Sequence, residues 1–204
     1  MRGRPPSIRE DEILDAARDV FREQGHAATT AEIARRAGVS EGILFYRYKT
    51  KEALLAAVIQ RETEPPERLR ELVKEAGRRS LASNLEILVE TILDSTLRVH
   101  PLMELGLTSP SSEVIHRTLM STAAKPSPEQ TVELIGAYLL AETRIGRVRT
   151  MDPIPVARAI FGGCIDFVHS RRLPHPTGNR ASFVQGIVQL LLSGVRSSTD
   201  PDKK

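Results

Sequence analysis

Acidic and histidine side chains that could do chemistry recur along this sequence. Glu86, Glu90 and Asp94 stand four residues apart, which would place three carboxylates on one helix face, where they could act as general acid and base or hold a cation. A solvated acidic stripe has the same spacing. His169 and His175 lack the third convergent ligand that a zinc site needs. We therefore predict neither catalytic carboxylates nor a metal site.

The single cysteine fits a structural role. Cys164 excludes an intramolecular disulfide and any cysteine-cluster metal site, and a chain with one cysteine fits a reducing compartment. A catalytic thiol needs a partnered base, but Asp166 and His169 fall on the other side of the same predicted helix. Gly162 and Gly163 follow no strand, so they form no phosphate loop. The sequence therefore predicts a protein that is not an enzyme and needs no cofactor.

Composition places the chain among globular proteins. Of its 204 residues, 40% are hydrophobic and 27% are charged, which is enough to build a buried core. No run approaches the roughly 18 apolar residues of a membrane span, and the start of the chain lacks the apolar stretch of a signal peptide. We expect a cytoplasmic protein with no membrane partner.

Positive charge is concentrated near the N-terminus. The net charge is only +3, but residues 1–9 contain three arginines and no acid, and residues 35–51 contain five basic residues and one acid. One small module with this charge could contact nucleic-acid phosphates, although an ordinary solvated surface would give the same totals.

Apolar residues recur with the helical period of 3.6 throughout, and no segment alternates as a strand does, so the chain is predicted to be all-α. Capping side chains predict helix starts at Thr29, Ser40, Thr50 and Asp152. We expect helices over residues 8–24, 29–37 and 40–46, a longer one from residue 50, and further helices over 67–80, 81–100, 132–145, 153–170 and 180–196.

Residues 29–48 have the pattern of a helix-turn-helix. Ala34 is small where two helices cross closely, Gly38 can adopt the left-handed turn conformation, and Val39 fills the angle between the helices. Three apolar side chains close the core beneath them: Ile33, Ala37 and Leu44. The second helix keeps a polar, aromatic and basic face that suits base edges and phosphates, made by Ser40, Glu41, Ile43, Tyr46 and Arg47.

These residues, with the Phe45-Tyr46-Arg47-Tyr48 block and Lys51-Glu52-Ala53-Leu54, resemble the TetR family of one-component bacterial transcriptional regulators. The resemblance extends over roughly residues 8–60. It implies a three-helix helix-turn-helix DNA-binding domain over residues 1–50, with an arm over 1–7. A C-terminal helical ligand-binding and dimerisation domain would cover residues 51–204, with a terminal helix pair at about 153–170 and 180–196.

The resemblance also implies which residues contact DNA. They are Arg2, Arg4, Thr30, Ser40, Glu41, Gly42, Ile43, Phe45, Tyr46, Arg47 and Lys51. Glu41, Gly42, Ile43 and Tyr46 match positions nearest the bases, and Thr30, Phe45, Arg47 and Lys51 match positions on the phosphate side. Phe45 stands where tyrosine is commoner, so a hydroxyl that could donate to phosphate is missing.

Some of these positions have a second interpretation. Glu41 could accept from a cytosine amino group or interact with a helix dipole. Lys51 could hold a phosphate at a helix N-terminus or be a solvated lysine. Arg2 and Arg4 resemble a minor-groove hook, but a plain basic tail has the same composition.

The last two predicted helices are too apolar for the surface of a monomer. A homodimer interface is predicted at Phe161, Ile165, Val168, Val184, Val188 and Leu191, packed against the same helix pair of another copy as a four-helix bundle. The alternative is that loops and neighbouring helices of one chain cover both faces.

We expect a ligand-responsive, sequence-specific repressor that binds an inverted-repeat operator in double-stranded DNA as a homodimer and is nucleoid-associated when bound. The resemblance implies an unknown small-molecule effector among the middle helices, with the fourth helix as the lever. Pocket candidates, each of which could equally be core, are Leu88, Ile92, Thr96, His100, Met103, Leu107 and Tyr138. The alternative is a nucleoid-bound architectural protein whose C-terminal domain recruits a protein partner.

Overall fold

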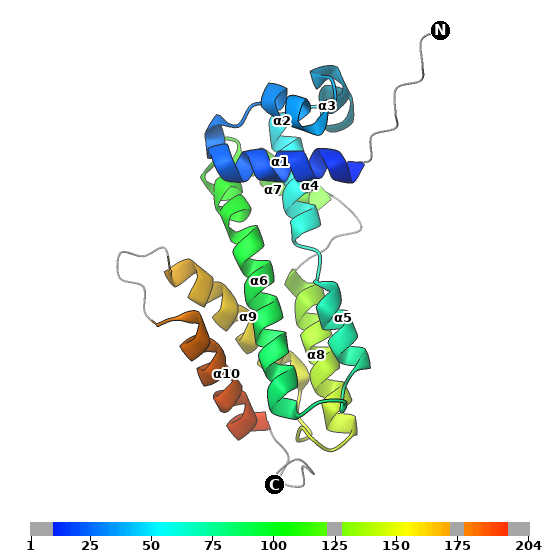
Figure 1. Cartoon of the computed structure of the whole chain (residues 1–204), viewed down its shortest axis with the longest axis vertical. Helices are drawn as coiled ribbons and strands as arrows, with labels where there is room; N and C mark the ends of the chain where they lie inside the picture. The colour runs from blue at the N-terminus through cyan, green and yellow to red at the C-terminus, as the bar shows by residue number, and fades with distance from the viewer. Residues whose placement is uncertain (1–9, 122–127, 172–177, 196–204) are drawn as a thin grey trace. The chain divides into compact units, whose positions relative to one another are not determined.

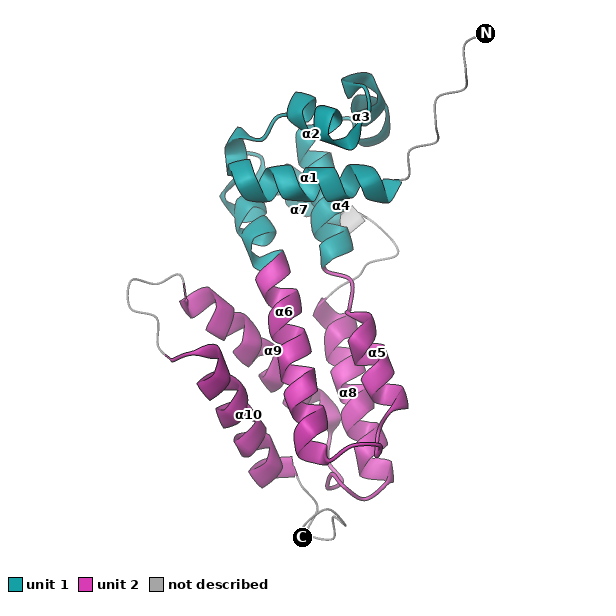
Figure 2. Cartoon of the chain, viewed as in Figure 1, with its two compact units in different colours: residues 1–62, 99–125 teal, residues 63–98, 126–204 magenta. Residues whose placement is uncertain are grey.

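The computed structural model describes residues 10–121, 128–171 and 178–195, and every regular element in these ranges is helical (Figure 1). The prediction of an all-α fold is confirmed. None of the described helices is long and apolar enough to cross a membrane. The chain divides into two compact units, each with its own apolar core (Figure 2).

Unit 1 comprises residues 1–62 and 99–125. Its helices are α1 (Glu10–Gln24), the short 3-10 helix η1 (Gly25–Ala27), α2 (Thr30–Ala37), α3 (Glu41–Tyr48), α4 (Lys51–Glu62) and α7 (Ser112–Ser121). The chain position expected to end the first domain, residue 50, falls inside this unit, because α4 packs against α1, α3 and α7. The fourth helix, expected to be long, ends at Glu62 before the two following prolines.

Local capping signals fix the ends of these helices. Thr29 accepts a hydrogen bond from the backbone N–H of Glu32 at 3.2 Å, and Thr50 accepts one from the N–H of Ala53 at 3.0 Å, as predicted. Ser40 stands at the N-cap of α3, but its side chain makes no capping bond there. The predicted N-cap position of Ser40 is therefore confirmed, without a side-chain capping bond.

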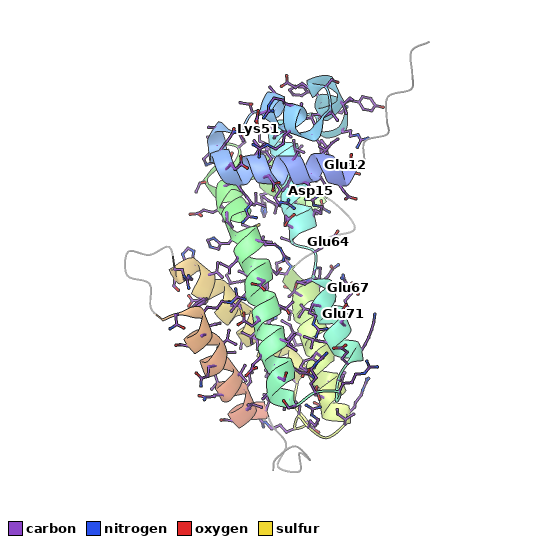
Figure 3. The ribbon with its side chains drawn as sticks, viewed as in Figure 1. Glu12, Asp15, Lys51, Glu64, Glu67 and Glu71 are labelled. Atoms are coloured by element: carbon purple, nitrogen blue, oxygen red, sulfur yellow. The ribbon has the colours of Figure 1, made fainter. Side chains whose placement is uncertain are left out.

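The core of unit 1 lies between α1, α2, α3 and α4. Fully buried apolar side chains fill it, including Ile13, Ala17, Val20, Ile33, Leu44, Leu54, Val58 and Ile59. At the surface, Asp15 of α1, labelled in Figure 3, pairs with Arg61 of α4 at 2.9 Å. This arrangement holds the helix-turn-helix on two supporting helices.

Helix α6 (Leu81–Thr108) is longer than predicted and runs through Pro101. A proline inside a helix removes one backbone hydrogen bond and costs roughly 3 kcal/mol. Leu102, the next residue, is completely buried in the core of unit 1, so packing of the following turn offsets that cost. Residues 81–98 of α6 belong to unit 2 and the rest to unit 1.

Unit 2 comprises residues 63–98 and 126–204. It contains α5 (Glu67–Lys74), the first part of α6, α8 (Pro128–Arg144), α9 (Pro153–Ser170) and α10 (Arg180–Val195). Helix α5 is shorter than the predicted span of 67–80, because Gly77 turns the chain with a φ of +82°. Asp152 caps α9 by accepting from the N–H of Ile154 at 3.0 Å, as predicted.

A polar cluster lies inside the core of unit 2. The side chain of Glu142 on α8 is completely buried, and its carboxylate accepts hydrogen bonds from the Asn84 amide at 3.2 Å and the Gly77 N–H at 3.4 Å. The Nε of Arg147, also buried, lies 3.4 Å from the second oxygen of Glu142, and its guanidinium donates to the Arg79 carbonyl at 2.6 Å. These bonds connect α8 to the start of α6 and to the loop before it.

Candidate nucleic-acid interface

The candidate site is the face of α3 that points away from the core of unit 1. Leu44 is only 2% exposed and anchors the helix, whereas Tyr46 is 80% exposed and Phe45 is 47% exposed. Glu41, Gly42 and Arg47 are exposed as well, and Ile43 is half-buried. Two large aromatic side chains are therefore exposed on this helix and available to a partner.

The turn between α2 and α3 sets the direction of this face. Gly38 adopts the left-handed conformation with a φ of +68°, which side chains disfavour. The N–H of Val39 donates to the Ala34 carbonyl at 3.0 Å, and this bond closes the end of α2. The predicted turn of the helix-turn-helix is confirmed.

Thr30 and Glu41 are bonded to each other. The hydroxyl of Thr30, at the start of α2, donates to the Oε1 carboxylate oxygen of Glu41, at the start of α3. The contact joins residues at the first turns of the two helices. The Thr30 hydroxyl, expected at a phosphate, therefore has a protein acceptor.

Lys49 belongs to the same surface, and in the sequence it is one of the five basic residues of the segment 35–51. Its backbone has a φ of +64°, and its ammonium donates to the Tyr46 carbonyl at 2.8 Å. The ammonium also lies 5.2 Å from the centre of the Tyr46 ring. Lys49 thus adds a positive charge beside an exposed aromatic ring.

Lys51, labelled in Figure 3, begins α4, and its side chain is hydrogen-bonded to the protein backbone. Its ammonium donates to the carbonyls of His26 and Ala28, each at 3.1 Å. These carbonyls belong to η1 and the loop before α2, so Lys51 holds that loop against α4. Its expected contact with a phosphate stays a prediction, and in the structure its ammonium is bonded to these carbonyls.

Part of the positive charge near α2 is neutralised within the protein. Arg36 donates to both oxygens of Glu23, at 2.6 and 2.8 Å, and Arg35 donates to both oxygens of Glu32, at 2.8 and 2.7 Å. The hydrogen bonds from these guanidinium groups lower the pKa of both carboxyl groups. All four groups are at the surface, where such pairs add little to stability.

Tyr48 fixes the C-terminal end of α3 instead of joining the exposed face. Its hydroxyl donates to Glu10 of α1 at 3.3 Å. Burial and the Glu10 carboxylate raise the pKa of Tyr48 to about 12, so the phenol keeps its proton and donates at neutral pH.

A cavity of about 250 Å³ lies within unit 1, beside Lys51. Its apolar wall is made by Phe21, Leu55, Leu105 and Ile115, and its polar side chains include His26, Lys51 and Glu52. None of the residues predicted to form an effector pocket lines it. Leu88, Ile92 and Tyr138 are buried in the core of unit 2, whereas Met103 packs against the core of unit 1.

Of the three remaining pocket candidates, two have polar side chains and the third, Leu107, lies on the surface. Thr96 donates its hydroxyl to the Ile92 carbonyl at 2.8 Å, within its own helix. His100 is half-buried in the part of α6 that belongs to unit 1. Leu107 is 73% exposed, because it lies on the outer face of the last turn of α6, and it therefore lines no enclosed pocket.

The predicted dimer interface is mostly buried within the chain itself. Val168, Val184, Val188 and Leu191 belong to the core of unit 2, so they cannot also form an open surface. Phe161 is partly buried against that core, whereas Ile165 of α9 is 40% exposed. Leu190 of α10, which was not predicted, is 68% exposed. The expectation that the six side chains face a partner is corrected for the three valines and the leucine.

The candidates for chemistry in unit 2 have structural partners. Glu90 and Asp94 both accept from Arg180 of α10, the latter at 2.7 Å. Cys164 is fully buried, and burial raises the pKa of its thiol to about 12. His175, Arg2 and Arg4 lie outside the described residues.

The fold and the exposed face of α3 define a class: an all-helical protein with a helix-turn-helix DNA-binding domain supported by two further helices. Residues 13–58 match the family model of the bacterial regulatory proteins of the TetR family. These residues therefore form a DNA-binding domain of the TetR family type.

Known proteins similar in sequence match over about a quarter of the chain. The HTH-type transcriptional regulator BetI of Klebsiella pneumoniae is 48% identical over 54 residues, which are 26% of this chain and 28% of that protein. BetI of Escherichia coli is 46% identical over 55 residues, with the same two shares. The match thus spans less than a third of the length of these relatives.

Solved structures match over nearly the whole chain. A protein from Mesorhizobium loti assigned to the TetR family has a TM-score of 0.71 and 17% identity, covering 91% of this chain and 96% of that one. FadR from Bacillus subtilis, solved in complex with stearoyl-CoA, has a TM-score of 0.62 and 19% identity, covering 92% and 100%. SmeT, the repressor of the Stenotrophomonas maltophilia efflux pump SmeDEF, has a TM-score of 0.59 and 20% identity, covering 95% and 93%. At these identities the likeness establishes the fold.

Proposed function

We propose that this protein is a ligand-responsive transcriptional repressor that binds an inverted-repeat operator in double-stranded DNA as a homodimer. The observation that carries the proposal is the exposed face of α3, where Phe45 and Tyr46 are uncovered on a helix that Leu44 anchors. A helix presented in this way by a helix-turn-helix enters the major groove and reads base edges. Such a regulator works at the chromosome, so we place it in the cytoplasm, associated with the nucleoid when bound.

We assign the DNA contacts by the position and exposure of each residue on α3 and at its ends. Glu41, Gly42, Ile43 and Tyr46 face the bases, and Ser40, Phe45, Arg47 and Lys49 face the backbone. Lys51 contributes mainly by holding the loop before α2. Arg2 and Arg4 add charge from the N-terminal arm and strengthen binding by counterion release.

We place the effector in unit 2 and expect it to be a small molecule. Structural neighbours of this fold include FadR in complex with stearoyl-CoA, which supports ligand binding as a property that the fold can carry. Leu88, Ile92, Thr96 and Tyr138 are the predicted wall residues that lie in this unit. A ligand releases DNA by binding the DNA-free state more tightly, with a coupling free energy of about 1–3 kcal/mol.

We assign dimerisation to the outer faces of α9 and α10. Ile165 and Leu190 are large apolar side chains left open on these helices, and Phe161 is only partly covered. A second copy that supplies the same helix pair would bury all three as a four-helix bundle.

Selection of binding sites from random duplex DNA tests the proposal. The purified full-length chain is expected to enrich a palindrome, and the stoichiometry on the winning site should be one or two dimers. Salt-sensitive binding without any enriched sequence would overturn the proposal and favour an architectural DNA-binding protein. The enriched site would then serve as the probe in a screen for effectors that release it.

A further inference from the structure

A carboxylate on the DNA-facing surface of a regulator needs an explanation. Glu41 is exposed at the start of α3, on the face that the proposed function places in the major groove. Duplex DNA carries one negative charge per roughly 1.7 Å, so a carboxylate there weakens binding to every sequence by repulsion. Binding recovers only where the carboxylate meets a hydrogen-bond donor.

The major groove offers few such donors. Cytosine presents an amino group and adenine presents an amino group beside the N7 acceptor, whereas guanine and thymine present acceptors at the corresponding positions. A carboxylate accepts from the cytosine amino group and is repelled by the acceptor atoms of guanine and thymine. At adenine it gains one bond but faces N7. Cytosine is therefore the best partner for Glu41.

The bond from Thr30 aims the carboxylate. The Thr30 hydroxyl donates to Oε1 of Glu41 and restricts the rotation of that side chain before DNA arrives. The bond leaves Oε2 as an acceptor; among the bonds of the described residues, Thr30 is the partner found for Glu41.

We propose that Glu41 is a specificity-determining residue that selects cytosine at one position of each operator half-site, with Thr30 as its positioning residue. The inference rests on the proposed function, since it concerns how the same face of α3 reads DNA. It departs from the roles that the sequence implied for Thr30, because the threonine acts through Glu41 and not on a phosphate.

Binding-site selection with matched variants tests the inference. The wild-type chain, Glu41→Gln and the control Glu12→Gln, which removes an exposed carboxylate from α1, are each selected on random duplex DNA. Wild type and Glu12→Gln are expected to prefer cytosine at one half-site position, by about tenfold over other bases. Glu41→Gln should move that preference to adenine, because glutamine pairs with adenine N6 and N7, and leave the other positions unchanged.

Thr30 is tested through preference and salt dependence together. Thr30→Val, which removes the hydroxyl, should weaken the cytosine preference roughly threefold and leave the slope of affinity against salt concentration unchanged. Thr30→Ser keeps the donor and should retain the wild-type preference. A Thr30→Val variant that loses affinity equally for all sequences, with a shallower salt slope, would place Thr30 at a phosphate and overturn its positioning role.

The outcomes separate this inference from the proposed function. If the wild-type chain enriches no palindrome, the proposed function itself fails. The wild-type chain could enrich a palindrome while Glu41→Gln keeps the same preference at every position and binds all sequences more tightly. In that case Glu41 only weakens DNA binding by charge repulsion. That result would overturn the inference and leave the regulator intact.

Discussion

The two units of this chain handle polar side chains in opposite ways. In unit 1, Glu41 and Lys49 are exposed and their bonds join surface groups that water can also satisfy. In unit 2, Glu142 and Asn84 are fully buried and bonded to each other inside the core. Surface pairs contribute little to folding, whereas a buried charge without its partner is strongly destabilising. Unit 1 can therefore change partners at its surface, while the buried polar groups of unit 2 hold the fold.

The largest effect is expected at the buried carboxylate. Glu142→Ala should lower the free energy of unfolding by about 3–5 kcal/mol, because Arg147 would keep a buried charge without its carboxylate. Urea denaturation followed by circular dichroism measures the change. Glu86→Ala on the exposed side of α6 is the matched control and should stay within about 0.5 kcal/mol of wild type. If both variants lose the same free energy of unfolding, the buried carboxylate of unit 2 is no more important for stability than an exposed one.

Lys51 of unit 1, like the buried polar side chains of unit 2, is bonded to groups of its own protein. Lys51→Ala should lower the free energy of unfolding by about 1.5–3 kcal/mol, since a charged donor loses its two carbonyl acceptors. Lys49→Ala, which removes an exposed ammonium from the end of α3, is the control and should change stability little. The free energy of unfolding and the salt dependence of DNA binding are both measured for the two variants. If Lys51→Ala leaves stability unchanged and lowers the slope of DNA affinity against salt concentration by about 1, Lys51 contacts a phosphate instead.

Tyr46→Ala tests whether a residue on the exposed face of α3 contributes to DNA binding without contributing to stability. Tyr46→Ala should leave the free energy of unfolding within about 0.5 kcal/mol of wild type, because the ring is 80% exposed. Affinity for the selected operator should fall about tenfold, and the preferred sequence should change. Val114→Ala, an exposed apolar position on α7 of the same unit, should change neither. A uniform loss for all sequences would argue against base contact by Tyr46.

The smallest effect at neutral pH concerns the thiol of Cys164 in unit 2, because it appears only in alkaline solution. Burial raises its pKa to about 12 from an ordinary value near 9, so the folded state holds a proton that the unfolded state has lost between these values. The stability contributed by the neutral thiol is complete below pH 9 and is lost as pH rises from about 9 to 12. Cys164→Ala should show a shallower alkaline loss of stability than wild type. Rapid reaction of the folded wild-type thiol with a disulfide reagent at pH 8 would show that it is not buried.

Local signals in the sequence predicted the helix-turn-helix well. Thr29 and Thr50 cap helices and Gly38 turns the chain, because each of these effects depends on a few neighbouring residues. The helix through Pro101 was missed, since burial of Leu102 outweighs a local breaking signal. Four of the predicted dimer residues proved to be core, because periodicity marks an apolar side chain without saying which surface covers it.

The sequence by itself determined the all-helical fold, the helix-turn-helix domain and the amino acids available on α3. Those properties depend on periodicity, caps and residue types, which are written along the chain. The tertiary structure alone decided that Thr30 bonds Glu41, that Lys51 holds backbone carbonyls, and that Glu142 lies buried beside Arg147. The first two contacts join residues 11 and 25 positions apart and depend on how helices cross, which no local pattern encodes.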